Sequence, residues 1–156
     1  MSFPSTLEGE IAARGRKVAI AAARFNDFIV ASLLKGATAA WLEHGGAEQD
    51  LLVVRVPGAF ELPVVARKLA LSGHYDAVIA LGCVIRGDTP HFDYVAGECA
   101  RGLQLASLET GVPIVFGVLT VENVEQALQR ANLTGVNKGG ESMATALEMA
   151  SLMPRL

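Results

Sequence analysis

The stretch Asp76–Phe92, DAVIALGCVIRGDTPHF, joins a continuous apolar run to a polar turn. Its first part, Ala77–Cys83, is short and rich in β-branched residues, which is typical of a strand buried on both faces of a parallel sheet. A helical spacing of apolar residues begins soon after the turn. A strand that passes through a short turn into a helix indicates a βαβ unit. The stretch therefore predicts an α/β fold.

Three further runs have the same character, namely Lys17–Ala23, Leu51–Val56 and Pro113–Leu119. Helical spacing predicts five helices around them, covering Asp27–His44, Phe60–Leu71, a segment through Val95, Cys99, Leu103 and Ala106 that Gly111 ends, Glu122–Ala131 and Ser142–Leu152. We expect Asn26 to cap the first helix and Pro63 to lie in the first turn of the second. This alternation predicts a flavodoxin-like, three-layer α/β/α fold with a four-stranded parallel sheet.

The chain has 156 residues, a length that suits one domain. We expect residues 1–15 to form a flexible N-terminal segment and residues 16–156 to form the folded domain. Hydrophobic residues make up 51% of the chain and charged residues 19%, and the mean hydropathy is +0.38. This composition is more apolar than a monomer of this size requires, so it predicts self-association.

Several classes of protein are disfavoured. No apolar run reaches the ~20 residues of a membrane span, and the N-terminus lacks the apolar core of a signal peptide, so we expect a cytoplasmic protein. Cys83 and Cys99 have no metal-ligand spacing and are interpreted as buried thiols, so no metal site is expected. The net charge of −3 and the scattered cations disfavour a nucleic-acid partner.

The turns that follow the predicted strands carry aromatic, glycine and polar residues. Ligands of open α/β sheets bind beyond the carboxyl ends of the strands, so these turns are the candidate site. Phe25 follows the first strand and Phe60 the second, and the two rings could sandwich a planar heterocycle whose polar edge Glu61 would take. The alternative is that both phenylalanines are ordinary core residues.

The turn after the third strand combines features of an anion site. Gly87 permits a tight turn, and the amides of Asp88 and Thr89, with the Thr89 hydroxyl, could bind a phosphate where the next helix begins. This hypothesis requires the Asp88 carboxylate to face solvent. The alternative is a plain connection in which Thr89 caps the helix. His91 is the candidate for proton transfer, against the alternative of an exposed or core histidine without a role.

Two cations, Arg130 and Lys138, lie near a glycine-rich turn, NKGGE, which lacks the spacing of a P-loop. Arg130 could equally be a solvated cation at a helix end. The local chemistry of these residues thus predicts a pocket that binds a flat ring and a phosphate and contains a histidine. It does not identify a reaction.

Five motifs, taken together and in order, resemble the lumazine synthase family. They are Phe25-Asn26, Pro57-Gly58-Ala59-Phe60-Glu61, Gly82-Cys83-Val84-Ile85-Arg86-Gly87 with Thr89 and His91, Phe116-Gly117-Val118-Leu119-Thr120, and Asn137-Lys138-Gly139. The resemblance implies a metal- and cofactor-independent transferase that condenses 5-amino-6-(D-ribitylamino)uracil with 3,4-dihydroxy-2-butanone 4-phosphate. The product would be 6,7-dimethyl-8-ribityllumazine, formed in the penultimate step of riboflavin biosynthesis.

The resemblance also implies roles for individual residues. His91 would transfer protons, and Asp88, Thr89 and Arg130 would bind the butanone phosphate. The residues implied to bind the ribitylaminouracil are Phe25, Asn26, Ala59, Phe60, Glu61, Cys83, Val84, Ile85 and Phe116. Phe116 and Arg130 would reach the site from an adjacent subunit, and Lys138 is a further candidate. Asp88 stands where family members often have a small residue, so its phosphate contact would come from its amide.

The resemblance further implies a homopentamer, and in many members twelve pentamers form a hollow icosahedral shell. Riboflavin synthase is a candidate partner. Two rival interpretations come from other classes of protein: a flavodoxin-like carrier or receiver domain, and a shell or flavin-binding relative that has lost catalysis. Only Asp27 is available for the acidic cluster of a receiver, and Arg24-Phe25-Asn26 is not the hydroxyl-rich loop of a flavodoxin. His91 argues against the loss of catalysis.

Overall fold

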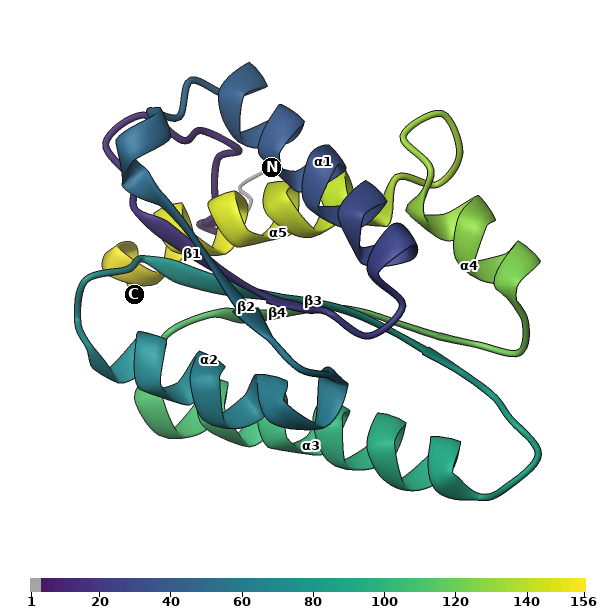
Figure 1. Ribbon diagram of the computed structural model, residues 1–156. Coiled ribbons are helices and arrows are strands. Elements are labelled where there is room, and N and C mark those ends of the chain that lie inside the picture. The colour runs from purple at the N-terminus through teal and green to yellow at the C-terminus, as the bar shows by residue number, and fades with distance from the viewer. Residues whose placement is uncertain (1–3) are drawn as a thin grey trace.

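A computed structural model describes residues 4–156, and this range forms a three-layer α/β/α fold (Figure 1). The strands within it are β1 (Val18–Ala23), β2 (Leu51–Val56), β3 (Ala77–Ile85) and β4 (Ile114–Val121). The α-helices are α1 (Asp27–Glu43), α2 (Leu62–Leu71), α3 (His91–Thr110), α4 (Val124–Ala131) and α5 (Lys138–Leu152). The predicted fold class is confirmed.

The four strands form one parallel sheet in the order β2-β1-β3-β4. Helices α1, α4 and α5 cover one face of this sheet, and α2 and α3 cover the other (Figure 1). The central neighbours β1 and β3 therefore send their chains to opposite faces, β1 into α1 and β3 toward α3. Such a switch point opens a crevice at the carboxyl ends of the two strands. The topology thus positions a site between β1 and β3.

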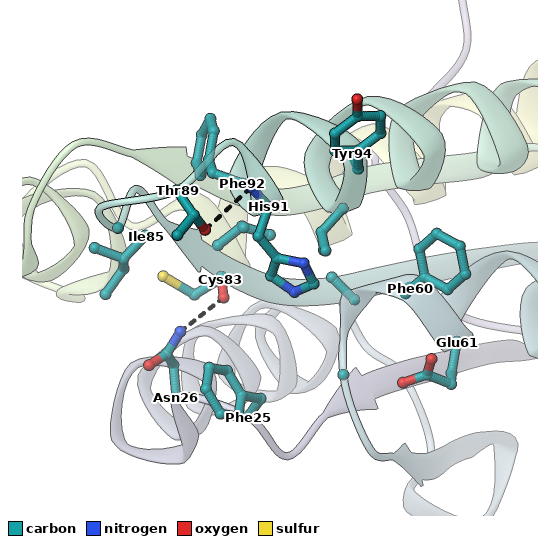
Figure 2. Close-up of a pocket in the computed structure, with 15 residues that line it drawn as sticks. Phe25, Asn26, Phe60, Glu61, Cys83, Ile85, Thr89, His91, Phe92 and Tyr94 are labelled. Carbon is teal, nitrogen blue, oxygen red and sulfur yellow. Dashed lines mark hydrogen bonds between the residues drawn. The ribbon is translucent and has the colours of Figure 1, made fainter.

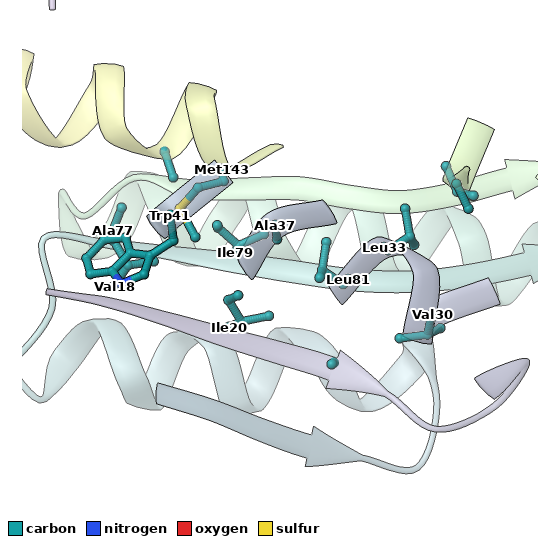
Figure 3. Packing of buried hydrophobic residues seen from close by; sticks show 14 of the residues in the cluster. Val18, Ile20, Val30, Leu33, Ala37, Trp41, Ala77, Ile79, Leu81 and Met143 are labelled. Carbon is teal, nitrogen blue, oxygen red and sulfur yellow. The ribbon is translucent and has the colours of Figure 1, made fainter. Parts of the chain in front are cut away.

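The core consists of two clusters, one on each side of the sheet. Alternate residues of β1 belong to the two clusters in turn: Val18 and Ile20 face α1 and α5, whereas Ala21 faces α2 and α3. Trp41 of α1 is fully buried in the first cluster, beside Met143 (Figure 3). Its indole nitrogen donates a hydrogen bond of 2.9 Å to the Ala47 carbonyl, so its one polar atom is satisfied.

Burial differs between the central and the edge strands. Every residue of β1 is buried, but Leu52 and Val53 of the edge strand β2 remain 40% and 37% exposed. The interpretation that all four strands are buried on both faces is therefore wrong for the edge strands of a single chain. An edge strand has one neighbour fewer, and its side chains are covered only where a helix reaches them.

Most predicted element boundaries agree with the structure within two residues, and two of the differences have a cause in the packing of the chain. β3 continues past Cys83 to Ile85, because Val84 and Ile85 pair with the end of β4. α5 begins at Lys138, four residues earlier than predicted from apolar spacing. Its first turn is capped by Asn137, whose side-chain oxygen accepts a hydrogen bond of 3.1 Å from the Gly140 amide. The sequence NKGGE is therefore the start of a helix and not a loop.

The chain before β1 lies along the end of α5. The Glu10 amide donates to the Ser151 hydroxyl at 2.6 Å, and Arg155 donates to the Glu8 carbonyl at 2.8 Å. Ala13 is buried, and its amide bonds to the His44 carbonyl at 3.0 Å. Residues 1–3 lie outside the described residues, and a flexible segment 1–15 stays a prediction. In the range 4–156, no helix combines the length and apolar character needed to cross a membrane.

Candidate active site

A cavity of about 640 Å³ lies at the carboxyl ends of the strands, at the switch point between β1 and β3 (Figure 2). Ten of the predicted site residues line it: Phe25, Asn26, Ala59, Phe60, Glu61, Cys83, Val84, Ile85, Thr89 and His91. The first turns of α3 add Phe92, Tyr94 and Val95, which sequence reasoning missed. Tyr94 and Val95 lie three and four residues after His91, a spacing that places residues on one helix face, and this was the available signal for them. Phe92, the next residue after His91, carried no such signal.

Phe25 and Phe60 form the aromatic part of the cavity wall. Their side chains are 73% and 57% exposed, so the alternative that they are core residues is wrong. The turn that carries Phe25 is bonded to the end of β2, because the Arg24 amide donates to the Val56 carbonyl at 2.7 Å and the Phe25 amide to the Pro57 carbonyl at 2.9 Å. An exposed ring on a fixed backbone is suited to stacking on a flat ligand.

Asn26 lies at the N-cap position of α1, but its side chain does not cap the helix. Its backbone is left-handed, with φ 61° and ψ 46°, and its side chain makes no capping hydrogen bond to α1. Instead its Nδ2 donates to the Cys83 carbonyl at 2.9 Å (Figure 2). The predicted side-chain cap is therefore wrong, because the amide is used to join the end of β1 to the end of β3.

The turn between β3 and α3 lies at the helix N-terminus. The His91 amide donates to the Thr89 hydroxyl at 3.4 Å, which is a local turn contact. The N-cap of α3 is Pro90 and the helix has no side-chain cap, so the alternative in which Thr89 caps the helix is wrong. Thr89 and Gly87 line the cavity. Asp88 is exposed and does not line the cavity, as the phosphate hypothesis requires. The free amides of a helix N-terminus favour an anion here.

His91, the first residue of α3, is exposed and lines the cavity that also contains Phe25 and Phe60 (Figure 2). Arg86 stabilises the turn that precedes His91. The Arg86 guanidinium donates to Glu122 at 2.8 Å and to Asp93 at 3.3 Å, and it lies 4.3 Å from the centre of the Phe92 ring. These contacts connect the His91 turn to the segment between β4 and α4.

Cys83 lines the cavity as a neutral thiol. Burial raises its pKa to about 11, so little thiolate forms near neutral pH. The thiolate is the reactive form of cysteine, and a nucleophilic role for Cys83 is therefore disfavoured. Its backbone carbonyl is the group that contacts Asn26.

Three predicted site residues lie elsewhere on the chain. Phe116, Arg130 and Lys138 line a separate depression of about 470 Å³ beside the edge strand β4. The Arg130 guanidinium donates to the Gln126 carbonyl of its own helix at 3.3 Å, and the Lys138 ammonium pairs with Glu141 at 3.0 Å. A single chain therefore divides the predicted residues between two surfaces.

The donor set offers little to a metal ion. Residues 4–156 contain no group of three or more histidine, cysteine, aspartate or glutamate side chains placed to hold one. What the cavity does bring together is aromatic surface, a glycine-bearing turn at a helix N-terminus, a carboxylate and an imidazole.

Comparison with known protein families identifies a family to which the chain is similar. The model of the family described as 6,7-dimethyl-8-ribityllumazine synthase matches residues 15–154 of the chain. The matched range contains all five helices and four strands of the described structure, and both the cavity and the depression beside β4.

Proposed function

This chain belongs to the 6,7-dimethyl-8-ribityllumazine synthase family, and we propose that the cavity between β1 and β3 is where it performs the family's reaction. It is a transferase of riboflavin biosynthesis that forms 6,7-dimethyl-8-ribityllumazine. The substrates are 5-amino-6-(D-ribitylamino)uracil and 3,4-dihydroxy-2-butanone 4-phosphate. The observation that carries the assignment is the presence, in one cavity, of two exposed aromatic rings, the N-terminus of α3 and His91.

The pyrimidine ring stacks on Phe25 and contacts Phe60 in this proposal. The exposure of both rings supports it, because an aromatic face that is not packed against protein is available to a ligand. Glu61 and Ala59 take the ring edge and the ribityl chain, and the backbone of Cys83, Val84 and Ile85 lies along the other side. Asn26 is assigned to the same subsite.

The phosphate of the butanone binds at the turn before α3. The amides of Asp88 and Thr89 and the Thr89 hydroxyl are its proposed donors, supported by their position at a helix N-terminus. Asp88 contributes through its amide, because its carboxylate would repel the phosphate. Arg130, with Phe116 and with Lys138 as a further candidate, completes the site from a neighbouring copy.

The reaction needs proton transfers and orientation. The uracil amine attacks the ketone to give a carbinolamine, and loss of water gives an imine. Elimination of phosphate and tautomerisation then allow the ribitylamino nitrogen to close the ring, with loss of a second water. His91 is the proposed proton-transfer group for these steps, and it contributes less of the rate than the positioning of the two substrates does.

A homopentamer, in which each site lies between neighbours, is part of the proposal. The separation of Arg130 from His91 within one chain supports it, because a neighbour must then supply the cation. The two alternatives for the full assembly are a free pentamer and an icosahedral shell of twelve pentamers, with riboflavin synthase as a candidate partner. Light scattering during size-exclusion chromatography distinguishes a pentamer of about 80 kDa from a shell of about 1 MDa, from the chain mass of 16.4 kDa.

We further propose that the enzyme works in the cytoplasm without metal or cofactor. Its two cysteines are buried free thiols, which suits a reducing compartment. The test of the function is a turnover assay with both substrates and EDTA, followed by the fluorescence of the lumazine. Product formed at the same rate with and without EDTA supports the proposal. Binding of the pyrimidine without product in either condition would contradict it and favour a binding protein.

A further inference from the structure

Asn26 combines two features that a substrate contact alone does not require. Its backbone is left-handed, and its side-chain amide donates a hydrogen bond to β3, which is not its own strand. We propose that Asn26 is a positioning residue that holds the Phe25 turn against the end of β3 and so fixes the width of the slot for the pyrimidine. This inference rests on the proposed function and adds a role that the assignment of Asn26 to substrate binding does not contain.

The β1–β3 ladder ends just before the cavity. Its last paired residues are Ala22 and Leu81, and β3 continues for four residues beyond Leu81 alongside β4 alone. The two strands therefore separate where the crevice opens. The 2.9 Å hydrogen bond from Asn26 to the Cys83 carbonyl crosses this separation two residues past the last pair on β3. It joins the two walls of the cavity at the point where the sheet no longer does.

The opposite side of the Phe25 turn is held by other groups. The Arg24 amide donates to the carbonyl of Val56, the last residue of β2, at 2.7 Å, and the Phe25 amide donates to the Pro57 carbonyl at 2.9 Å. Arg55 of β2 adds hydrogen bonds to the carbonyls of Ala22 and Ala23, at 3.3 and 3.4 Å. The turn is thus fixed on its β2 side by backbone hydrogen bonds and by the Arg55 guanidinium, and Asn26 supplies the corresponding contact on the β3 side.

The requirement for asparagine follows from both features. At φ 61° a residue with a β-carbon is strained, and glycine, asparagine and aspartate tolerate this conformation best. A carbonyl acceptor needs a donor opposite it, which glycine lacks and which an ionised aspartate replaces with a second acceptor. Asparagine satisfies the backbone and the hydrogen bond together.

Two substitutions separate positioning from direct contact with substrate. Asn26→Gly keeps the left-handed backbone and removes the amide, and Asn26→Asp keeps the shape and removes the donor. Dissociation constants are measured by fluorescence for 6,7-dimethyl-8-ribityllumazine and for 6,7-dimethyllumazine, which has no ribityl chain. Hydrogen exchange of the peptide that covers residues 82–90 reports on the end of β3.

We expect Asn26→Gly to weaken the binding of both ligands by the same factor, roughly five- to tenfold for the loss of one hydrogen bond. We expect Asn26→Asp to weaken them at least as much and both variants to speed exchange in the peptide 82–90. Loss of affinity for both ligands without faster exchange in the peptide 82–90 would show a direct contact with the ring, and loss of affinity for the ribityl ligand alone would show a contact with its chain; either result would overturn the proposal. Unchanged affinity in either variant, or faster exchange without any loss of affinity, would overturn it as well.

Asn137→Gly is the matched control. Asn137 is the other left-handed asparagine among residues 4–156, at φ 52°, and its side chain caps α5 outside the cavity. The same substitution there should lower the melting temperature and leave both dissociation constants within about twofold. A wild-type protein that binds both lumazines, with these responses at Asn26, but forms no product in the turnover assay would refute the proposed function and leave the positioning role standing.

Discussion

Replacing Phe25 with alanine tests the aromatic wall of the cavity. The Phe25 side chain is 73% exposed, so about a quarter of its surface is packed against the protein. Truncating a fully buried phenylalanine costs about 3–5 kcal/mol. Scaled by the packed fraction, the expected loss in the free energy of unfolding is about 1 kcal/mol, or a fall in Tm of about 2–4 °C for a chain of this length.

Phe25→Ala should reduce the free energy of ligand binding more than it reduces the free energy of unfolding. Stacking of a base on an aromatic side chain contributes about 1–3 kcal/mol in alanine substitutions. A loss of about 2 kcal/mol raises a dissociation constant about 30-fold. Phe25→Ala should therefore weaken the binding of 6,7-dimethyl-8-ribityllumazine about 30-fold while the protein remains folded at the assay temperature.

Fluorescence titration and thermal unfolding measure the two quantities on the same sample. Phe28→Ala is the control, since Phe28 is also exposed, at 57%, and lies in the first turn of α1 but does not line the cavity. It should leave the dissociation constant unchanged. The reasoning is refuted if Phe25→Ala loses the 3–5 kcal/mol of stability typical of a core residue, or if its dissociation constant stays at the wild-type value.

Three further predictions concern other parts of the molecule. His91→Ala should lower kcat by about 100-fold, at the low end of the range for general acid–base catalysis, with both substrates still bound. Loss of all detectable turnover with binding intact would contradict the view that positioning dominates. Burial raises the pKa of the Cys83 and Cys99 thiols to about 11, so the unfolded chain ionises these thiols at lower pH than the folded one. The free energy of unfolding should therefore be constant with respect to these thiols below about pH 8.5 and fall as the pH rises toward 11. Urea denaturation at pH 8 and at pH 10.5 should show a smaller fall in this free energy when both cysteines are replaced by alanine. Gly139→Ala places a methyl group against the backbone of α1 and should cost about 2–3 kcal/mol in urea denaturation, whereas Gly97→Ala, with open space around it, should cost nothing.

The fold was accessible from the sequence because the strands are short apolar runs between segments of helical spacing. The boundaries were less accessible where pairing or close packing decides them. β3 reaches Ile85 because β4 continues beside it, a long-range contact that local spacing does not contain. α5 starts at Lys138 because Gly139 and Gly140 allow close contact with neighbouring backbone and side-chain atoms, and glycines leave no apolar signal.

The candidate site was accessible as far as strand ends determine it. Phe25, Phe60 and His91 follow three different strands, and a parallel sheet brings such positions to one edge. The direction of a side chain was not accessible in the same way. Asn26 has a capping residue type at a capping position, yet its amide reaches β3, whereas Asn137, with a similar left-handed backbone, does cap its helix. The capping rule describes local contacts and cannot include this one.

Trp41 is the only tryptophan in the chain, and it lies in the core cluster on the α1 side of the sheet, away from the cavity. Its emission will therefore report loss of the packed interior and will respond little to occupancy of the cavity. Lumazines emit in the visible region, at longer wavelengths than an indole. Folding and ligand binding can accordingly be followed through two spectrally separate signals in one cuvette, without a label or an added chromophore.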